Sequence, residues 1–424
     1  MLQLPPLSLY VHMPWCVRKC PYCDFNSHAA PEHIPQDAYV DALLQDLDQD
    51  LTAVQGRSLR SIFFGGGTPS LFGPDAIARL LEGVHARIAL DAAVEVTMEA
   101  NPGTIEHGRF AAYRTAGVNR ISLGAQSFDD GHLRALGRIH GAADVVRAVH
   151  ELHTAGIDNF NLDLMYGLPA QTPEQALADL DAALALAPAH ISHYQLTLEP
   201  GTVFYHRPPP LPEPDSIWEM QLRCQQRLAE HGYVQYEVSA YARSRRQSRH
   251  NLNYWEFGDY IGIGAGAHGK LSSVGEAPAV VRSARVRQPR VYLSSRPQDR
   301  VVERRAVATQ DLPFEYMLNA LRLVDGFEEA DFEARTGLPF SVIEPTVSAA
   351  VRRGLLEGGP ATPARAPDSA SRTRGPGVQG WTADGAQRPA VPASRHWRAT
   401  ELGQRFLNDL QQMFLPVSAQ GGHK

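Results

Sequence analysis

From residue 7 to about residue 235, short apolar runs alternate with longer helix-like segments. The apolar runs are rich in β-branched and aromatic residues, which is typical of buried strands, and several of the segments between them open with Asp or Thr-Pro, as helices do. Six strands are predicted, at residues 7–12, 61–64, 94–99, 120–123, 160–164 and 190–196, with helices at 37–53, 75–87, 106–116, 144–155 and 173–185. This alternation predicts an α/β fold, an open partial (β/α)6 TIM-like barrel rather than a closed eightfold one.

Each predicted strand is followed by a polar or glycine-rich turn. The turns are HMPWC, GGGTPS, EANPG, GAQS, DLMYGLP and TLEPGT. In barrels of this kind the loops after the strand ends build the active site, so these separate motifs are expected to converge on one mouth.

Three regions are predicted along the chain: 1–235, 236–310 and 311–424. The second is an aromatic segment that contains HNLNYW, interpreted as strands and loops that close the barrel's flank. The third becomes helical from Asp311 and is typical of a small C-terminal winged-helix-like α+β domain. Residues 358–395 are dense in Pro, Ala, Gly, Ser and Arg, which predicts a disordered insertion between two short strands of that domain.

The composition sets limits on the class of protein. A chain of 424 residues with 43% hydrophobic residues is long enough for one large domain and a smaller one. A net charge of −6 gives no general reason to expect nucleic acid. Neither a secretory signal nor a membrane span is recognised, so a cytoplasmic chain is expected, where clustered cysteines are more often metal ligands or redox groups than disulfides. Cys224, alone in MQLRCQQRLAE, is expected to be a buried structural thiol.

The other three cysteines, Cys16, Cys20 and Cys23, lie within CVRKCPYCDF. Three thiolates can each hold one iron of a cubane cluster and leave the fourth iron open to a substrate. The alternative is a structural zinc site with His12 or His28 as the fourth ligand, although zinc loops usually bring their ligands as two separated pairs.

The CxxxCxxC spacing after the first strand, with Tyr22 before the last cysteine, resembles the signature of the radical S-adenosylmethionine (SAM) superfamily. The resemblance implies a [4Fe-4S] cluster on the three cysteines and S-adenosylmethionine chelating the fourth iron. It also implies an electron donor that reduces the cluster, so that the cofactor is cleaved to methionine and a 5′-deoxyadenosyl radical.

The neighbouring motifs resemble the cofactor-binding elements of that superfamily. Glycines 65 to 67 lack side chains and allow a ligand to approach the backbone. The resemblance assigns Gly66, Gly67 and Thr68 to the methionine amine, Glu99 to the ribose, Gln126, Arg138 and Asp163 to the cofactor mouth, and Tyr10 and Tyr22 to the flanks of the cluster and the adenine. For Glu99 and Asp163 the alternative is a helix cap or a surface ion pair.

Within the superfamily, GGGTPS, LGAQSF, LGRIH and DLMYGLP resemble the group around the oxygen-independent coproporphyrinogen III oxidase, which converts propionate side chains to vinyl groups with release of carbon dioxide. That oxidase has a further cysteine where this chain has Phe25 and an extension before the first strand, and both differences count against oxidase activity.

HNLNYW, residues 250–255, resembles a motif of the HemW-type heme chaperones. The resemblance implies that His250 is an axial ligand to heme iron and that Tyr254 and Trp255 offer flat apolar surface to the porphyrin. The alternative is a hydrogen-bonded core histidine in an aromatic strand. His268 is a weaker ligand candidate.

Four arginines, Arg243, Arg245, Arg246 and Arg249, precede this motif. Guanidinium groups bind carboxylates in a two-pronged geometry, so one hypothesis pairs them with heme propionates, and the other makes them a solvated loop.

Two functions follow from these resemblances. The first is a heme chaperone that carries the cluster and S-adenosylmethionine and delivers heme to acceptor apoproteins such as respiratory, membrane-associated ones. The second is a radical enzyme acting on a porphyrinogen or another tetrapyrrole. A radical enzyme with a different substrate is a third reading, so enzyme activity is left open.

Overall fold

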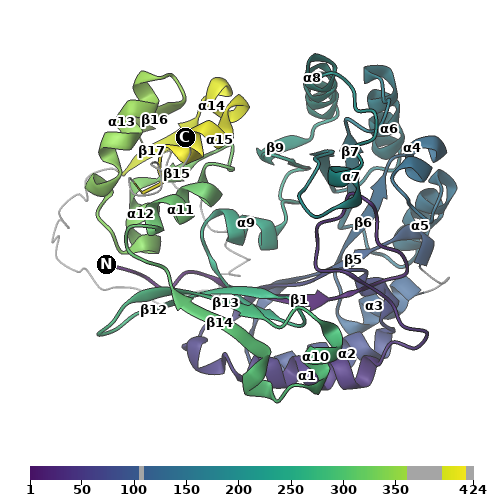
Figure 1. Ribbon diagram of the computed structural model, residues 1–424, viewed down its shortest axis with the longest axis horizontal. Coiled ribbons are helices and arrows are strands. Elements are labelled where there is room, and N and C mark those ends of the chain that lie inside the picture. Colours follow the sequence, from purple (N-terminus) through teal and green to yellow (C-terminus); the bar gives the residue numbers. More distant parts are fainter. Residues whose placement is uncertain (105–108, 361–393, 417–424) are drawn as a thin grey trace, which may run out of the picture.

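The structure is a computed structural model that describes residues 1–104, 109–360 and 394–416. It contains a large α/β part and a small C-terminal part, which lie side by side in Figure 1. The elements of the large part position the site.

Seven parallel strands form the centre of the main sheet. In sheet order they are β11 (Asp259–Ile263), β1 (Leu7–Met13), β4 (Leu59–Gly66), β5 (Leu90–Ala100), β6 (Arg120–Gln126), β7 (Phe160–Tyr166) and β8 (His190–Gln195). The six predicted strands are confirmed. The seventh, β11, comes from the flanking segment and pairs with β1, so the parallel part is one strand wider than predicted.

Antiparallel strands extend both edges of this sheet. Beyond β8 lie β10 (Ala240–Ala242) and β9 (Val234–Glu237), and beyond β11 lie β12 (His268–Ser273), β13 (Ala279–Arg285) and β14 (Val301–Ala306). A separate parallel pair, β2 (Trp15–Cys16) and β3 (His28–Ala29), joins the two ends of the cysteine loop.

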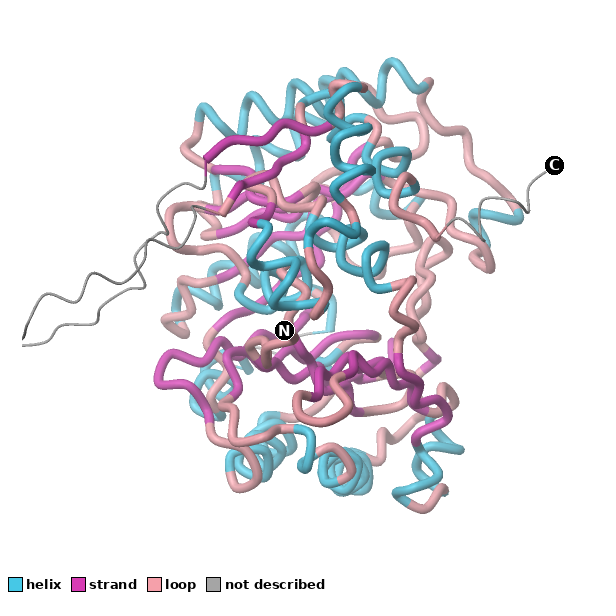
Figure 2. Tube along the Cα trace, turned by 90° about the vertical axis from the view of Figure 1, so that its left-hand side faces the viewer, coloured by secondary structure: helices cyan, strands magenta, loops and turns pink. Residues whose placement is uncertain are grey.

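Helices cover the outer face of the sheet, as the strand–helix alternation predicted (Figures 1 and 2). They are α1 (Gln36–Asp48), α2 (Pro74–His85), α3 (Arg109–Ala116), α4 (Asp130–Ala135), α5 (Ala142–Thr154), α6 (Pro173–Ala185), α8 (Pro214–Glu230) and α10 (Pro289–Ser294). The predicted helix at 37–53 is shorter than expected, because α1 ends at Asp48 and a 3-10 turn follows at Leu51–Ala53. Residues 106–108 of another predicted helix lie outside the described residues.

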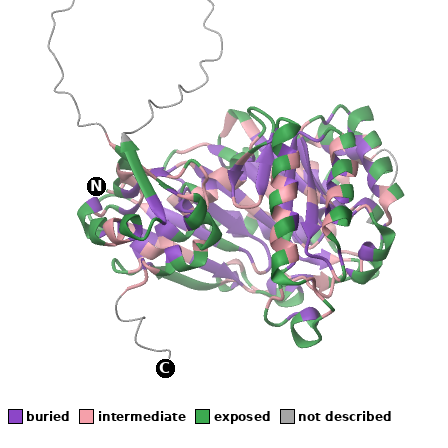
Figure 3. Cartoon of the chain, turned by 90° about the horizontal axis from the view of Figure 1, so that it is seen from above, coloured by how far each residue is buried: buried purple, intermediate pink, exposed green. Residues whose placement is uncertain are grey.

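The two faces of the strands differ in chemistry. On β6, Ile121 and Leu123 pack into the hydrophobic core beneath the helices, whereas Arg120 and Ser122 alternate with them and face the inside of the barrel. The inner faces of closed barrels are packed with branched apolar residues. Figure 3 shows the buried strands between more exposed helices. This barrel therefore encloses a buried but polar interior.

The HNLNYW motif is helical, and its interpretation as part of a strand is wrong. It forms α9 (Arg249–Trp255), which contacts β1, β4 and β11 on the inner face of the sheet (Figure 1). Ser248 caps the helix by accepting a hydrogen bond from the backbone N–H of Asn251 at 3.3 Å. A carboxylate from β5, that of Glu95, accepts the backbone N–H groups of Arg249 and His250, both at 3.1 Å. These bonds satisfy N-terminal donors that have no partner within a helix.

The C-terminal part is a small α+β domain, as predicted. Its helices are α11 (Leu312–Ala320), α12 (Glu329–Thr336), α13 (Glu344–Arg352), α14 (Glu401–Arg405) and α15 (Leu407–Gln412), and its antiparallel strands are β15 (Phe327–Glu328), β17 (Arg395–Ala399) and β16 (Leu356–Pro360), with β17 in the middle. Its core includes Tyr316, Phe332 and Phe340. The winged-helix assignment stays a prediction.

The strands β16 and β17 are the two short strands expected on either side of the insertion. The predicted bounds of the insertion, 358–395, are too wide, because residues 358–360 belong to β16 and Arg395 to β17; residues 361–393 lie outside the described residues. Within the parts of the chain that the structure describes, none of the helices has the length and apolar character needed to cross a bilayer.

Candidate functional site

A pocket of about 380 Å³ lies at the carboxyl ends of the parallel strands. Its walls come from the cysteine loop, the glycine turn after β4, and the ends of β5 to β8. Every residue assigned to the cluster or to S-adenosylmethionine except Tyr10 lines it, namely Cys16, Cys20, Tyr22, Cys23, Gly66, Gly67, Thr68, Glu99, Gln126, Arg138 and Asp163, whereas the candidate heme residues do not. The predicted convergence of the loops is thus found.

The three cysteines are free and partly buried in the pocket wall. Burial raises the pKa of the Cys16 and Cys23 thiols. The loop that carries them is closed by backbone bonds, from His28 to the carbonyl of Pro14 at 2.7 Å and from Ala30 to that of Cys16 at 2.8 Å. A fixed loop with three accessible thiols is the donor set that a cubane cluster with one open iron requires.

The structure bears on the zinc alternative as well. Both ring nitrogens of His12 have protein partners, the Tyr10 hydroxyl at 3.0 Å and the carbonyl of Asn26 at 2.9 Å. Among the described residues, no group of three or more His, Cys, Asp or Glu side chains is arranged to hold a single metal ion. A cubane places each cysteine on a different iron, so its thiols do not have to meet at one point.

The glycine turn packs directly against the strand that leads into the cysteine loop. A Cβ atom on Gly67 would lie 2.6 Å from the carbonyl oxygen of Trp15, and one on Gly66, whose φ is +110°, would lie 2.5 Å from the His12 ring. The backbone N–H groups of Gly67 and Thr68 donate to the carbonyls of Met13 and Trp15 at 2.7 and 2.8 Å. The glycines were predicted to let a ligand approach the backbone. In the structure, the backbone of Met13 and Trp15 approaches them closely.

Glu99 and Asp163 place two half-buried carboxyl groups at the pocket wall. Glu99 accepts a hydrogen bond from the backbone N–H of Gly66 at 3.1 Å. Burial, with a contribution from the nearby Asp163, raises the pKa of Glu99 to about 8. Asp163 accepts hydrogen bonds from Ser122 at 3.0 Å and Asn161 at 2.8 Å, and burial raises its pKa too. Neither carboxyl caps a helix or forms an ion pair with another described residue.

Arg138 connects the cysteine loop to β6. One terminal nitrogen of its guanidinium donates to the Cys20 sulfur at 3.6 Å, and the other donates to the carbonyl of Gly124 at 2.8 Å. Gln126 adopts a left-handed backbone, φ +69°. A Cβ atom on Gly124 would lie 2.9 Å from the Gln126 amide nitrogen, so Gly124 gives both polar side chains their room. Sequence reasoning missed Gly124, although its position in RISLGAQ places it on the polar face of the strand.

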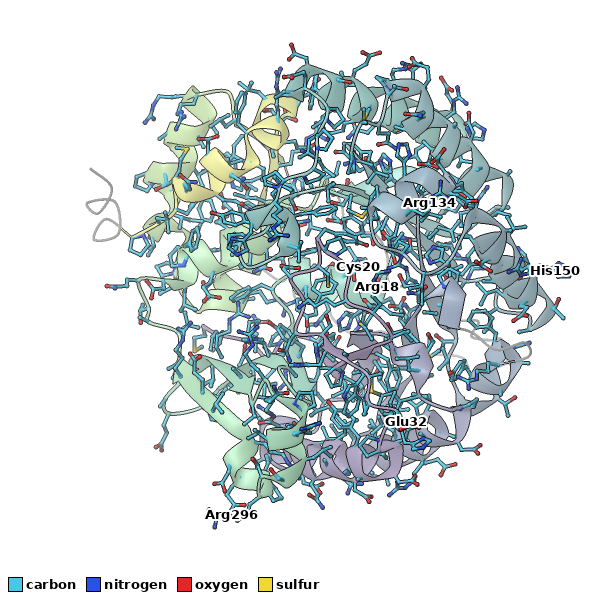
Figure 4. All side chains as sticks on the ribbon, turned by 45° about the vertical axis from the view of Figure 1, so that its right-hand side comes forward. Arg18, Cys20, Glu32, Arg134, His150 and Arg296 are labelled. Atoms are coloured by element: carbon cyan, nitrogen blue, oxygen red, sulfur yellow. The ribbon has the colours of Figure 1, made fainter. Side chains whose placement is uncertain are left out.

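The pocket opens between exposed side chains of the cysteine loop. Phe25 is 58% exposed and lines the opening together with Arg18 and Lys19. In Figure 4, Arg18 and Cys20 lie in the middle of the view, whereas His150 and Arg296 lie near the outline of the molecule.

Tyr10 and His250 lie inside the barrel and not among the residues that line this pocket. The rings of Tyr10 and His250 are 6.3 Å apart, and the His250 ring stacks on Phe63 at 4.6 Å. His250 is 4% exposed, and its Nδ1 is 3.2 Å from the Ser61 hydroxyl. Burial lowers the pKa of His250 to about 3, so its imidazole is neutral near pH 7.

The aromatic surfaces predicted to face a porphyrin already contact protein groups. Tyr254 stacks on Tyr260 with ring centroids 4.2 Å apart, and the Arg322 guanidinium lies 4.4 Å from the centre of the Trp255 ring. His268 is exposed, on β12.

The four arginines before the motif are exposed. Arg249 donates to the carbonyl of Ala93 at 2.6 Å, and the Arg243 guanidinium lies 4.8 Å from the centre of the Tyr233 ring. Two members of the group are therefore already engaged with protein atoms.

Comparison with known proteins shows which family this chain belongs to. The radical SAM superfamily matches residues 10–183, which contain the cysteine loop and the glycine turn. Two relatives, each called heme chaperone HemW, are similar along the whole chain. The Escherichia coli protein is 46% identical over 98% of this chain and 100% of its own length, and the Haemophilus influenzae protein is 44% identical over 98% and 99%.

A solved structure, of coproporphyrinogen III oxidase (HemN) from Escherichia coli, described as a radical SAM enzyme, is similar in fold. The TM-score is 0.74, with 98% of this chain and 91% of that chain covered, at 20% sequence identity. At that identity the likeness shows the shared fold, a radical SAM barrel with a further domain.

Proposed function

Because the chain belongs to the HemW family and carries a radical SAM domain, we propose that it is a heme chaperone with a [4Fe-4S] cluster and S-adenosylmethionine in the cysteine-lined pocket. Heme is its cargo, which it passes to acceptor proteins. The main support for the proposal is the full-length similarity to relatives named as heme chaperones. In addition, one pocket is lined by the three thiols and by residues assigned to S-adenosylmethionine.

The residues of the pocket suit the two cofactors. The three thiols would hold three irons, and the N–H of Arg138 beside Cys20 would stabilise negative charge on the cluster's sulfur ligand. The backbone turn at Gly66 to Thr68 would bind the methionine end of S-adenosylmethionine, and Glu99 would bind its ribose hydroxyls. When bound and reduced, this cofactor pair supplies one-electron cleavage of a carbon–sulfur bond, and the electron donor is a separate protein or reagent.

His250 stays the proposed heme ligand. Its neutral imidazole has the protonation state that iron ligation requires, and Nε2 is the nitrogen not bonded to Ser61. Since the ring is 4% exposed and covered by Phe63 and Tyr254, the proposal requires that heme binding uncovers it. Some of the four exposed arginines before HNLNYW are proposed to pair with the heme propionates.

The test is anaerobic reconstitution of the cluster followed by hemin titration. Wild type is expected to bind hemin and give a Soret band, and His250→Ala is expected to shift that band and weaken binding. His150→Ala is the control, because His150 is an exposed histidine on α5 and is not a ligand candidate. A wild-type protein that binds no hemin, or that cannot pass hemin to an apo-acceptor, overturns the chaperone function. An identical band in wild type and His250→Ala removes only His250.

The oxidase is the second candidate, favoured by the fold shared with HemN over nearly the whole chain. Against it stands Phe25, at the position where the oxidase resemblance expects a further cysteine. Incubation with coproporphyrinogen III, S-adenosylmethionine and a reductant under anoxia separates the two, because only the oxidase forms vinyl groups.

A further inference from the structure

Two buried hydrogen-bond donors without partners lie side by side inside the barrel. Thr97 is 0% exposed and Arg120 is 2% exposed, and neither Thr97 Oγ1 nor Arg120 Nε has a hydrogen-bond partner among the described residues. They are register partners on the adjacent parallel strands β5 and β6. The strand alternation puts both side chains on the inner face, because Val96 and Ile121 next to them belong to the outer core.

The guanidinium of Arg120 makes no ion pair or hydrogen bond within the described part of the chain, although carboxylates lie nearby. Glu95 is occupied by the amino end of α9, where it accepts the N–H groups of Arg249 and His250. Asp163 accepts hydrogen bonds from Ser122 and Asn161, and the charge of Arg120 favours its ionised form, but the two side chains do not form an ion pair within the described residues. Buried polar groups are almost always paired, and a buried cation most of all. Arg120 is therefore a buried cation, and the nearby carboxylates of Glu95 and Asp163 accept their hydrogen bonds from other groups.

The other titratable groups around Arg120 are neutral or polar. His190 and His250 face it, and burial together with the charge of Arg120 lowers the pKa of both imidazoles. The Tyr236 hydroxyl lies on the same side and bonds His190 at 2.8 Å. None of these three groups forms an ion pair with Arg120 within the described residues, so its Nε–H still has no partner there.

The pair lies immediately below the cysteine pocket. Glu99 is two residues beyond Thr97 on the inner face of β5, and Ser122 is two residues beyond Arg120 on β6, and both line the pocket. A ligand group that extended past these two residues would meet the Arg120 guanidinium and the Thr97 hydroxyl.

We infer that Thr97 and Arg120 form an internal binding site for a carboxylate, entered through the floor of the cysteine pocket. A guanidinium presents parallel N–H donors that match the two oxygens of a carboxylate, and the hydroxyl adds a third donor from the adjacent strand. The carboxylate belongs either to a small organic acid or to a propionate arm of a tetrapyrrole, and the second source rests on the proposed heme function.

The first experiment uses propionate as the probe, on the cluster-reconstituted full chain. Thermal unfolding is followed with increasing sodium propionate, and with propionamide at matched ionic strength. Propionate is expected to raise the melting temperature of wild type and of the exposed-arginine control Arg134→Gln. Arg120→Gln is expected to lose the shift and Thr97→Val to reduce it, and propionamide is expected to have no effect.

The site is overturned if propionate leaves wild type unchanged, or if it shifts wild type, Arg120→Gln and Thr97→Val equally. If Arg120→Gln does not fold, Thr97→Val decides alone, since valine keeps the shape of threonine and removes only the hydroxyl.

A second experiment identifies the source of the carboxylate. Hemin and hemin dimethyl ester, which has no free carboxylates, are titrated into wild type and the variant that lost the propionate shift. A loss of about tenfold in hemin affinity with ester binding unchanged assigns the site to a tetrapyrrole propionate. Unchanged hemin binding assigns it to a small acid. Wild type that binds no hemin refutes the chaperone proposal and leaves the propionate result to decide on the site.

Discussion

The backbone N–H of Gly66 donates a hydrogen bond of 3.1 Å to the Glu99 carboxylate, which joins the end of β4 to the end of β5 at the pocket wall. This bond favours the charged form of the half-buried Glu99 carboxyl and lowers its pKa. Burial and the neighbouring Asp163 outweigh it and raise the pKa of Glu99 to about 8. The protonation of this carboxyl is consequently linked to both stability and cofactor binding.

Glu99 is predicted to make the protein without cofactors less stable as the pH rises. The ordinary pKa of the carboxyl is 4.5 and the folded value is about 8, so between these pH values the folded state binds more protons than the unfolded state. The free energy of unfolding therefore falls as pH rises through this window. Glu99→Gln removes this term, and at about pH 8.5 it is expected to be more stable than wild type by up to about 5 kcal/mol, with little difference at about pH 4.

Urea unfolding of the two proteins across this pH range measures the effect. Glu82→Gln, at an exposed position on α2, is the control and is expected to follow the wild-type curve. Parallel pH curves for wild type and Glu99→Gln would show that the carboxyl titrates normally in the fold.

Each of the three pocket cysteines is predicted to be necessary for the cluster. Cys16→Ala, Cys20→Ala and Cys23→Ala each leave two thiols for three irons, so reconstituted protein is expected to lose the iron, the sulfide and the visible absorption of the cluster. Iron and sulfide analysis after anaerobic reconstitution measures the outcome.

Cys224→Ala is the matched control, because this thiol is fully buried in α8 and does not line the pocket. It is expected to keep a full complement of iron. A pocket variant that also keeps it would show that its thiol is not a ligand.

The six strands and the convergence of their loops could be predicted because both follow from local patterns. Apolar runs separated by helical segments imply parallel strands, and parallel strands place their carboxyl ends together. The spacing of Cys16, Cys20 and Cys23 then identified the mouth, and the positions of Glu99 and Asp163 near the ends of predicted strands indicated that they lie there.

The rest depends on partners distant in sequence. Aromatic residues in HNLNYW favour a strand, but Ser248 and the β5 carboxylate of Glu95 cap this segment as a helix, and no local pattern reveals the second of these. The pairing of Thr97 with Arg120 depends on the register between β5 and β6, which cannot be predicted from the sequence alone. Likewise Tyr10 lies on the inner face of β1, against His250, rather than along the pocket.

Gly67→Ala is predicted to destabilise the protein and displace the cysteine loop. The added Cβ would lie 2.6 Å from the Trp15 oxygen and 2.8 Å from that of Met13, and both are backbone atoms that cannot rotate away. A loss of about 2 to 4 kcal/mol in the free energy of unfolding is expected, with lower iron content after reconstitution. Gly359→Ala in β16, where an added Cβ meets nothing within 4 Å, is the control. If Gly67→Ala and Gly359→Ala unfold at the same urea concentration, the backbone around Gly67 can move enough to accommodate a Cβ atom, and the prediction is wrong.

Glu95→Gln is predicted to loosen α9 and with it the burial of His250. The Glu95 carboxylate lies on β5 and accepts hydrogen bonds from the backbone N–H groups of Arg249 and His250 and from the Ser248 hydroxyl. A glutamine amide keeps one acceptor oxygen and loses the charge, so at least one buried donor is left without a partner, at a cost of about 1 to 3 kcal/mol.

Hydrogen exchange of the α9 amides should quicken by more than that of the β5 amides, and hemin should reach His250 more readily. Glu357→Gln, in an exposed ion pair with Arg398, should leave both rates unchanged. Wild-type exchange rates in α9 of Glu95→Gln would mean that contacts with Phe63 and Tyr260, rather than the carboxylate, hold the helix against the sheet.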